Sequence, residues 1–157
     1  MEQELKEINY RGGILRFKIP ANWIEEYEEN GGGTFYEDAP DTGTLRLNIL
    51  TMQAPSEVEG DLSVEALLMM PDVEAEKIVK LDNGNAITRS LERTKEQRKK
   101  ITLYWWYLAN YVPPDYVRIA NFSYTILSSQ EDLDSSRELI GLLDQQIKLA
   151  VFHPELG

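Results

Sequence analysis

The sequence predicts an α+β fold, in which an antiparallel β-sheet meander is flanked by helices within a single domain over residues 1–157. Three patterns support this prediction. The first is an aromatic and β-branched stretch from residue 101 to residue 127. The second is a set of shorter alternating stretches before it, and the third is a helical repeat near the C-terminus. A chain of 157 residues can bury a core without metals or disulfides.

The stretch 101–127 is interpreted as two long antiparallel strands. Proline has no N–H to donate to a ladder, so Pro113 and Pro114 mark a hairpin or wide loop between them. Along the first strand, Leu103 and Trp105 point to one face and Trp106 to the other. Both faces are therefore apolar, which predicts a central strand that is covered on each side.

The segments before this ribbon predict further strands and turns. Residues 1–13 are expected to form a polar lead-in that ends in a glycine turn, and residues 24–30 an acidic stretch. The strand at 14–19 alternates so that one of its faces, Leu15, Phe17 and Ile19, is buried. The other expected strands span residues 34–36, 45–52, 77–81 and 85–91, the last two joined through an Asn-Gly turn.

Two helices are predicted. Asp61 or Ser63 can cap a short helix that ends at Pro71. The second is a long, amphipathic C-terminal helix, which begins with a capping box formed by Ser135 and Glu138. Its apolar stripe, at helical spacing, includes Ile140, Leu143, Ile147, Ala150 and Val151. A stripe of this width predicts a well-buried helix that packs across the sheet.

The formal net charge is −11, and the acidic side chains are concentrated in the first half of the chain. Residues 1–76 hold 17 acidic and 5 basic side chains. Such a field disfavours nucleic acid and anionic membranes as partners, and it favours a basic protein. The alternative is that the charge serves solubility alone.

The chain contains no cysteine, which fits a reducing compartment. It has no N-terminal signal pattern and no apolar stretch that approaches the roughly 20 residues of a membrane span. We therefore expect a cytoplasmic protein.

No motif for catalysis, for a cofactor or for a metal stands out. His153 is the only histidine, and its place beside Pro154 near the chain end indicates a surface residue. The run of three glycines at 31–33 matches neither phosphate-binding spacing and has acidic neighbours, which indicates a turn. Because spacing cannot select one carboxylate pair among 27 acidic residues, we expect no enzyme activity, no cofactor and no metal site.

Two groups of residues are candidates for contact with a partner. Residues 92–100 reverse the chain, either as a hairpin tip or as a short helical turn, and the basic residues there are Arg93, Lys95, Arg98, Lys99 and Lys100. They could bind an acidic partner or a phosphate backbone, although a solvated tip needs no partner, and Glu92, Glu96 and the net charge disfavour nucleic acid. The second group is aromatic and consists of Trp23, Tyr104, Tyr111 and Tyr116. Exposed rings of this kind favour protein recognition, and core packing is the alternative.

The phrase Phe17-Lys18-Ile19-Pro20-Ala21-Asn22-Trp23 is a strand that closes on I-P-x-x-W. With the meander, short helix, aromatic hairpin and C-terminal helix that follow, it resembles the PsbP-like superfamily. That group includes the extrinsic photosystem II subunit, a Ran-binding nuclear-import factor and small bacterial chaperones for type VI secretion effectors. The resemblance implies an α/β/α sandwich and a binding or adaptor role, and it carries over no catalytic residue. The absence of a transit or lipoprotein signal favours the cytosolic adaptor versions.

We therefore expect a non-enzymatic protein that binds a protein partner, such as a secretion-effector chaperone or an immunity-type inhibitor. The alternative is a small-molecule module with a pocket between the aromatic sheet and the helices. The sequence leaves the partner and the oligomeric state open.

Overall fold

The structure, a computed structural model, describes residues 3–29, 31–40, 42–54 and 60–155. The strands are β1 (Leu5–Tyr10), β2 (Leu15–Pro20), β3 (Ile24–Tyr27), β4 (Gly33–Tyr36), β5 (Thr44–Gln53), β6 (Val79–Lys80), β7 (Ala86–Glu96), β8 (Lys99–Val112), β9 (Tyr116–Leu127) and β10 (Val151–Phe152). The helices are α1 (Leu62–Leu68) and α2 (Asp134–Lys148), and two 3-10 turns are η1 (Ala75–Lys77) and η2 (Ser128–Gln130). The predicted α+β class, with antiparallel strands and two helices, is confirmed.

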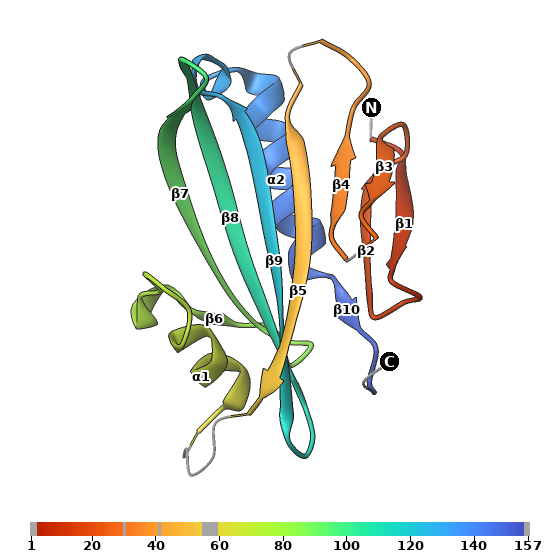
Figure 1. The fold of residues 1–157 in the computed structure, drawn as a ribbon, viewed down its shortest axis with the longest axis vertical. Coiled ribbons are helices and arrows are strands. Elements are labelled where there is room, and N and C mark those ends of the chain that lie inside the picture. The colour runs from red at the N-terminus through yellow and green to blue at the C-terminus, as the bar shows by residue number, and fades with distance from the viewer. Residues whose placement is uncertain (1–2, 30, 41, 55–59, 156–157) are drawn as a thin grey trace.

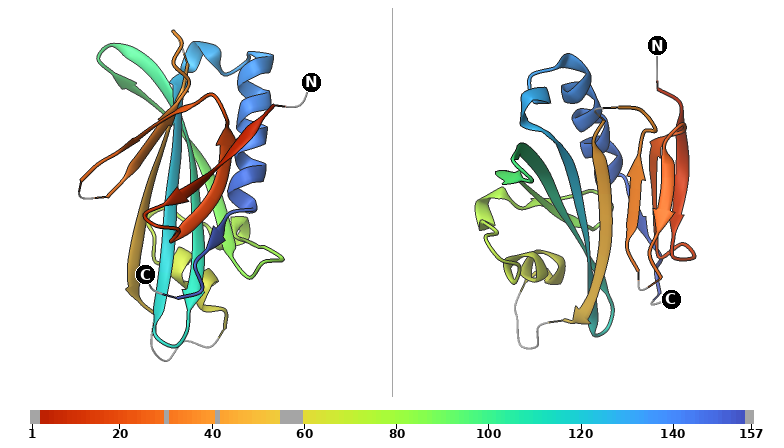
Figure 2. Two further views of the ribbon diagram at one scale, coloured as in Figure 1. Left: turned by 90° about the vertical axis from the view of Figure 1, so that its right-hand side faces the viewer. Right: turned by 45° about the horizontal axis from the view of Figure 1, so that its top comes forward.

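The larger sheet has seven strands in the order β3-β4-β5-β9-β8-β7-β6, and β9 pairs along its whole length with residues 101–112 of β8 (Figure 1). Side chains alternate across β8 as predicted. Trp106 and Leu108 enter the core that also holds residues of α2, whereas Tyr107 and Ala109 face the core under α1. The two helices therefore cover opposite faces of this sheet, as Figure 2 shows.

A second, three-stranded sheet has the order β1-β2-β10 and packs on the same face as α2. The strand predicted at 14–19 is β2, and Phe17 on its buried face contacts the rings of Phe35 and Phe122 edge to face. The expected polar lead-in, of which residues 1–2 lie outside the described residues, is wrong for residues 5–10, because β1 pairs with β2 and buries Ile8 and Tyr10. The glycine turn predicted at its end joins the two strands. Two apolar positions among charged neighbours gave too weak a pattern to indicate a strand.

The expected acidic stretch at 24–30 also begins as a strand. β3 pairs with β4, and tyrosine hydroxyls, one on each strand, donate to two of the exposed carboxylates of β3. Tyr27 donates to Glu25 and Tyr36 donates to Glu26, each with an oxygen–oxygen distance of 2.6 Å. Burial, followed by the contact with Glu25, raises the pKa of Tyr27. Hydroxyl donors thus let this edge hairpin carry many acids.

The C-terminal helix α2 is 15 residues long and begins at Asp134. The predicted capping box of Ser135 and Glu138 is wrong: the N-cap position is Leu133, which has no side-chain hydrogen bond. Leu143 and Ile147 are buried against the sheet. The chain then leaves the helix, and Val151 and Phe152 form the short strand β10 beside β2.

Asp61 is the N-cap of α1, one of the two residues predicted for that position. Its carboxylate accepts hydrogen bonds from the backbone N–H groups of Ser63 and Val64 and forms an ion pair with Lys80 at 2.5 Å. Partial burial acts to raise the pKa of Asp61, but hydrogen bonds from Lys80 and Ser63 outweigh it and lower the pKa to about 2.

Replacing Asp61 with alanine is expected to lower the free energy of unfolding by about 1 kcal/mol near neutral pH, mainly through loss of the cap. Because the folded-state pKa is depressed, this stabilisation is present above the unfolded pKa of about 3.9 and is lost as the pH falls through about 2. Urea unfolding of both proteins from pH 7 to pH 2 measures the difference. If the difference in the free energy of unfolding between the two proteins stayed constant from pH 7 to pH 2, this would contradict the role of the ionised carboxylate.

Candidate functional site

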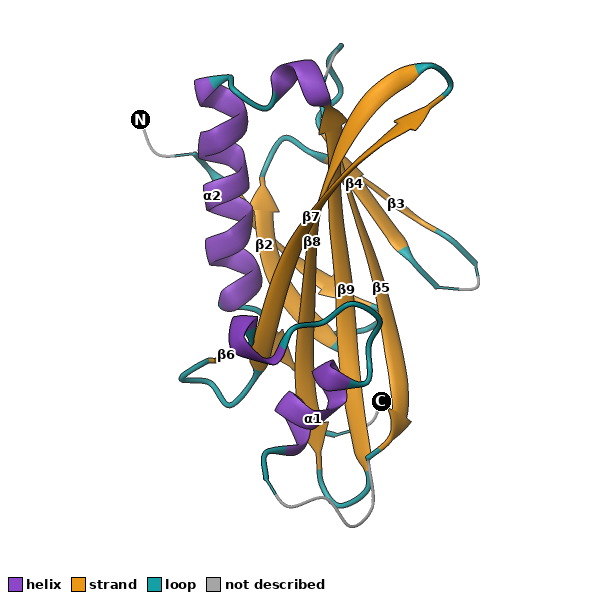
Figure 3. Ribbon diagram, turned by 90° about the vertical axis from the view of Figure 1, so that its left-hand side faces the viewer, coloured by secondary structure: helices purple, strands orange, loops and turns teal. Residues whose placement is uncertain are grey.

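The basic segment predicted at residues 92–100 is the hairpin that joins β7 to β8. The antiparallel pairs continue to Glu96 opposite Lys99, so that Gln97 and Arg98 alone make the turn. Figure 3 shows this hairpin projecting from the sheet at the end where α2 begins. Of the two forms that the sequence left open, the structure has the hairpin tip.

The cations of this segment fall into two groups. Arg93 binds Glu131 through two hydrogen bonds, from Nε at 2.8 Å and from Nη2 at 3.1 Å. Hydrogen bonds from Arg93 and Thr102 lower the pKa of Glu131. This ion pair ties the hairpin to the segment before α2, so Arg93 already has a structural partner.

The remaining cations are Lys95, Arg98, Lys99 and Lys100, which we call the basic tip. All four are exposed, and none forms an ion pair or a side-chain hydrogen bond within the part of the chain that the structure describes. Lys95 and Lys100 face each other across the hairpin, whereas Glu96 lies opposite Lys99, and the formal net charge of the protein is −11. The tip thus has a net positive charge on an acidic protein, although one acid, Glu96, lies within it.

The turn of the basic tip is also strained. Gln97 and Arg98 have φ values of 50° and 70°, in the left-handed region that two-residue hairpin turns require. Asn-Gly is the preferred pair there, and a left-handed conformation costs other residues about 1–2 kcal/mol each. The sequence therefore keeps a long cationic side chain at a position where glycine would be more stable.

Trp23 does not lie on an exposed surface. Its side chain is 4% exposed and stacks on Tyr124, with 6.2 Å between ring centroids and an interplanar angle of 11°. The expectation of an exposed tryptophan is therefore wrong, because the turn after β2 folds the ring onto β9. Tyr104 is half-buried and packs against the same core.

Tyr111 and Tyr116 lie at the other end of the aromatic hairpin. The hydroxyl of Tyr111 donates to the carbonyl of Pro114 at 2.9 Å, and its ring packs against the core under α1. Tyr116 is 37% exposed. Because the length of β8 separates these tyrosines from the basic tip, the structure does not bring the predicted contact residues together into one site.

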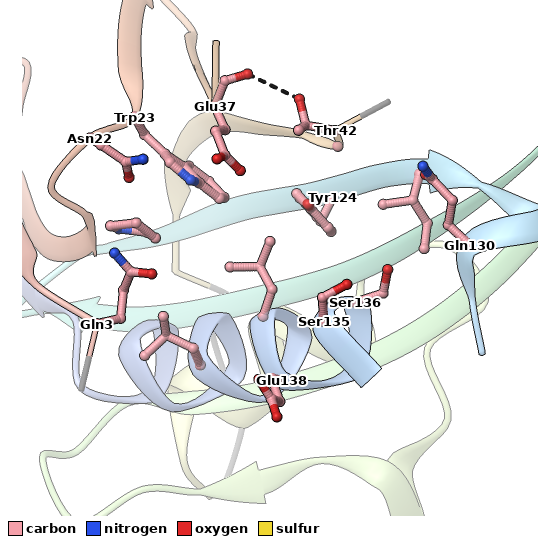
Figure 4. Close-up of a pocket in the computed structure, with 15 residues that line it drawn as sticks. Gln3, Asn22, Trp23, Glu37, Thr42, Tyr124, Gln130, Ser135, Ser136 and Glu138 are labelled. Atoms are coloured by element: carbon pink, nitrogen blue, oxygen red, sulfur yellow. Dashed lines mark hydrogen bonds between the residues drawn. The ribbon is translucent and has the colours of Figure 1, made fainter. Parts of the chain in front are cut away.

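A cleft of about 460 Å³ lies on the α2 face, between Trp23, Tyr124 and the first half of α2 (Figure 4). Glu37 and Glu138 line it, together with Leu139, and no lysine or arginine among the described residues does. Burial raises the pKa of Tyr124 to about 12, so this phenol is neutral. Such a lining suits a neutral or cationic molecule with an apolar part.

One glycine makes the close packing of this cleft possible. A Cβ atom on Gly43 would lie 2.3 Å from Cζ of Tyr124, so the backbone before β5 can approach the ring only without a side chain. The sequence predicts a pocket between the aromatic sheet and the helices only as an alternative, and it does not identify the walls of this cleft, which come from segments around residues 23, 43, 124 and 139. No local pattern connects them.

Among the described residues, no three or more histidine or acidic side chains gather in a way that could hold a metal ion. No helix in the same part of the chain is long and apolar enough to cross a membrane.

Solved structures show where this architecture recurs. A protein from Bacteroides thetaiotaomicron matches 94% of this chain with a TM-score of 0.63 and 18% identity, and this chain spans only 48% of that protein. LpqN, involved in cell envelope biogenesis of Mycobacterium tuberculosis, matches with a TM-score of 0.60 and 10% identity over 98% of this chain and 93% of its own. A point mutant of Mog1 matches with a TM-score of 0.55 and 11% identity, and the match covers 95% of this chain and 96% of the Mog1 chain.

The chain has the PsbP-like/Mog1 fold. The resemblance stated from the sequence is therefore confirmed at the level of the fold. No family model and no curated protein matches the sequence. At 10–18% identity, the PsbP-like/Mog1 architecture is what these three structures share with this chain.

Proposed function

We propose that this chain is a non-enzymatic protein-binding or adaptor domain that docks a partner through the β7–β8 hairpin. The observation that carries this proposal is the basic tip, which holds four exposed cations without partners in the described structure on a strained turn. Strained backbone conformations cluster at functional sites, which supports a role for this turn. The PsbP-like/Mog1 fold supports a binding role, because the superfamily that the sequence resembles consists mostly of binding and adaptor proteins.

The chemistry of the tip indicates an acidic surface on the partner. Exposed charges of one sign accelerate association with a surface of the opposite sign, and this effect weakens as salt increases. The acidic β3–β4 hairpin supplies a second charged surface that would suit a basic region of the same partner. A cytoplasmic secretion-effector chaperone or immunity-type inhibitor fits this combination, and neither nucleic acid nor membrane does.

The test is a pull-down from lysate of the source organism at low and moderate salt. The tip variant changes Lys95, Arg98, Lys99 and Lys100 to serine. A control variant changes four exposed cations elsewhere to serine, namely Arg16, Lys18, Arg46 and Lys77, so that both variants have the same net charge.

We expect wild type and the control variant to retain one stoichiometric partner, and the tip variant to retain at least about tenfold less. Moderate salt should reduce the wild-type yield. Equal retention by the tip variant would show that the partner docks elsewhere. The absence of any partner at either salt would contradict the binding function.

The cleft beside Trp23 favours a second candidate function, the binding of a small molecule. Native mass spectrometry of the purified protein tests it directly. A bound small molecule combined with no protein partner would favour this function over the adaptor role.

A further inference from the structure

The outer edge of β7 is open over most of its length. The neighbouring strand β6 pairs only with Ala86 and Ile87, and the chain before β6 forms the turn η1 instead of continuing the strand. From Thr88 to Glu96, no strand lies beside the outer edge of β7 within the part of the chain that the structure describes. A long open edge is a template on which another chain can pair.

The register identifies the backbone groups that point outward. In a two-residue hairpin turn, the flanking residues Glu96 and Lys99 exchange hydrogen bonds with each other, and bonded pairs then alternate along the ladder. The residues between these pairs on β7 are Arg89, Leu91, Arg93 and Lys95. Their N–H and C=O groups face away from β8 and are available to an added strand.

A cleft of about 470 Å³ runs beside this edge on the α1 face. Its floor includes Trp105 and Tyr107, whose rings stack with 6.5 Å between centroids, and residues 71–74 form its far wall. The β7 residues beside the rings are Thr88 and Ser90, which pair with Tyr107 and Trp105. Because these two side chains are small, an apolar side chain on an added strand can reach across them to the aromatic rings.

In the registers that pair most of the open edge, the charges of β7 disfavour a second copy of this chain as the occupant. An antiparallel two-fold pair must place residues of the same face opposite each other. If Leu91 pairs with Leu91 of the second copy, Arg89 of each copy lies opposite Arg93 of the other. If instead Glu92 pairs with Glu92, Arg89 lies opposite Lys95. Pairing Arg93 with its copy opposes like charges directly. Like charges that face each other destabilise a strand pair.

We propose that the outer edge of β7 binds an extended segment of a partner protein as an added antiparallel or parallel β-strand. The inference rests on the proposed protein-binding function and names the form of the ligand. The segment carries an acidic residue opposite Lys95, near the rest of the basic tip, and an apolar residue opposite Ser90, directed into the cleft. These two residues are five apart, the separation of Ser90 and Lys95, and so lie on opposite faces of the strand.

The test uses a displayed library of random peptides of about 12 residues, long enough to span the open edge in an extended form. Enriched peptides are synthesised, and their affinities are measured for wild type, Leu91→Pro and Leu91→Ala. Proline removes the outward N–H of Leu91 and leaves the ladder to β8 intact, a substitution that edge strands tolerate. Alanine keeps that N–H and is the matched control, because it loses the same exposed side chain.

We expect enriched peptides to share an apolar and an acidic residue five positions apart. Leu91→Pro should weaken their binding at least about tenfold and Leu91→Ala no more than about threefold. Lys95→Glu leaves the backbone edge intact and should also lower the affinity of the protein for these peptides about tenfold. Unchanged melting temperatures confirm that the variants are folded.

Failure to enrich any peptide, or equal binding to Leu91→Pro and wild type, would overturn the inference. A wild-type dimer that Leu91→Pro abolishes in sedimentation experiments would also overturn it, since the occupant would then be a second copy. The proposed adaptor function is judged separately, because a partner that depends on the basic tip and binds Leu91→Pro normally would support that function and refute the added strand.

Discussion

Replacing Phe122 with alanine is expected to lower the free energy of unfolding by about 3–5 kcal/mol. The side chain is fully buried on β9, and its ring meets that of Phe17 at 5.2 Å between centroids and an angle of 84°. Phe17 in turn contacts Phe35, so the lost ring would leave a cavity where the three-stranded sheet meets the seven-stranded sheet. Urea unfolding followed by circular dichroism measures the change.

Leu133→Ala is the matched control for this cavity. Leu133 is 51% exposed at the N-cap of α2, and its truncation should change the free energy of unfolding by no more than about 0.5 kcal/mol. A loss below about 1 kcal/mol for Phe122→Ala would contradict the packing of the small sheet on β9.

Replacing Arg118 with alanine is expected to lower the free energy of unfolding by about 3–4 kcal/mol. The Arg118 side chain is fully buried on β9, donates to Oδ1 of Asn110 and to the backbone carbonyls of His153 and Glu155, and lies over the ring of Phe152. It therefore fixes the chain after α2 onto the sheet. Burial lowers the pKa of Arg118.

A second variant separates volume from hydrogen bonding at this position. Arg118→Met fills most of the space but cannot donate, so it should cost about 1–3 kcal/mol through the acceptors it leaves unpaired. Thermal and urea unfolding of both variants give the comparison. Equal stability of Arg118→Met and wild type would show that the hydrogen bonds contribute no net stabilisation.

The sequence pattern predicted the elements that depend on local signals. Alternation at Leu15, Phe17 and Ile19 identified β2, and the proline pair marked the end of the central hairpin. The small sheet could not be predicted in this way. β1 and β10 are strands because both pair with β2, and Phe152 reaches it from the other end of the chain.

The candidate site was likewise predictable only where it consists of residues that are neighbours in the sequence. The basic tip is a run of neighbouring residues, and the sequence contains it directly. The open edge of β7 depends on where β6 ends, and hydrophobic periodicity does not define that point because Val79 and Lys80 are both exposed. The burial of Trp23 depends on Tyr124, which lies far from it in the chain and stacks on it only after folding.

Site-specific photo-crosslinking from the basic tip tests the docking surface most directly. A photoreactive amino acid replaces Arg98 in one protein and Arg16, an exposed residue of the small sheet, in another, and both are irradiated in cells of the source organism. Docking through the β7–β8 hairpin predicts one discrete protein adduct from position 98 and none from position 16. An adduct from position 16 alone, or from neither position, would contradict it.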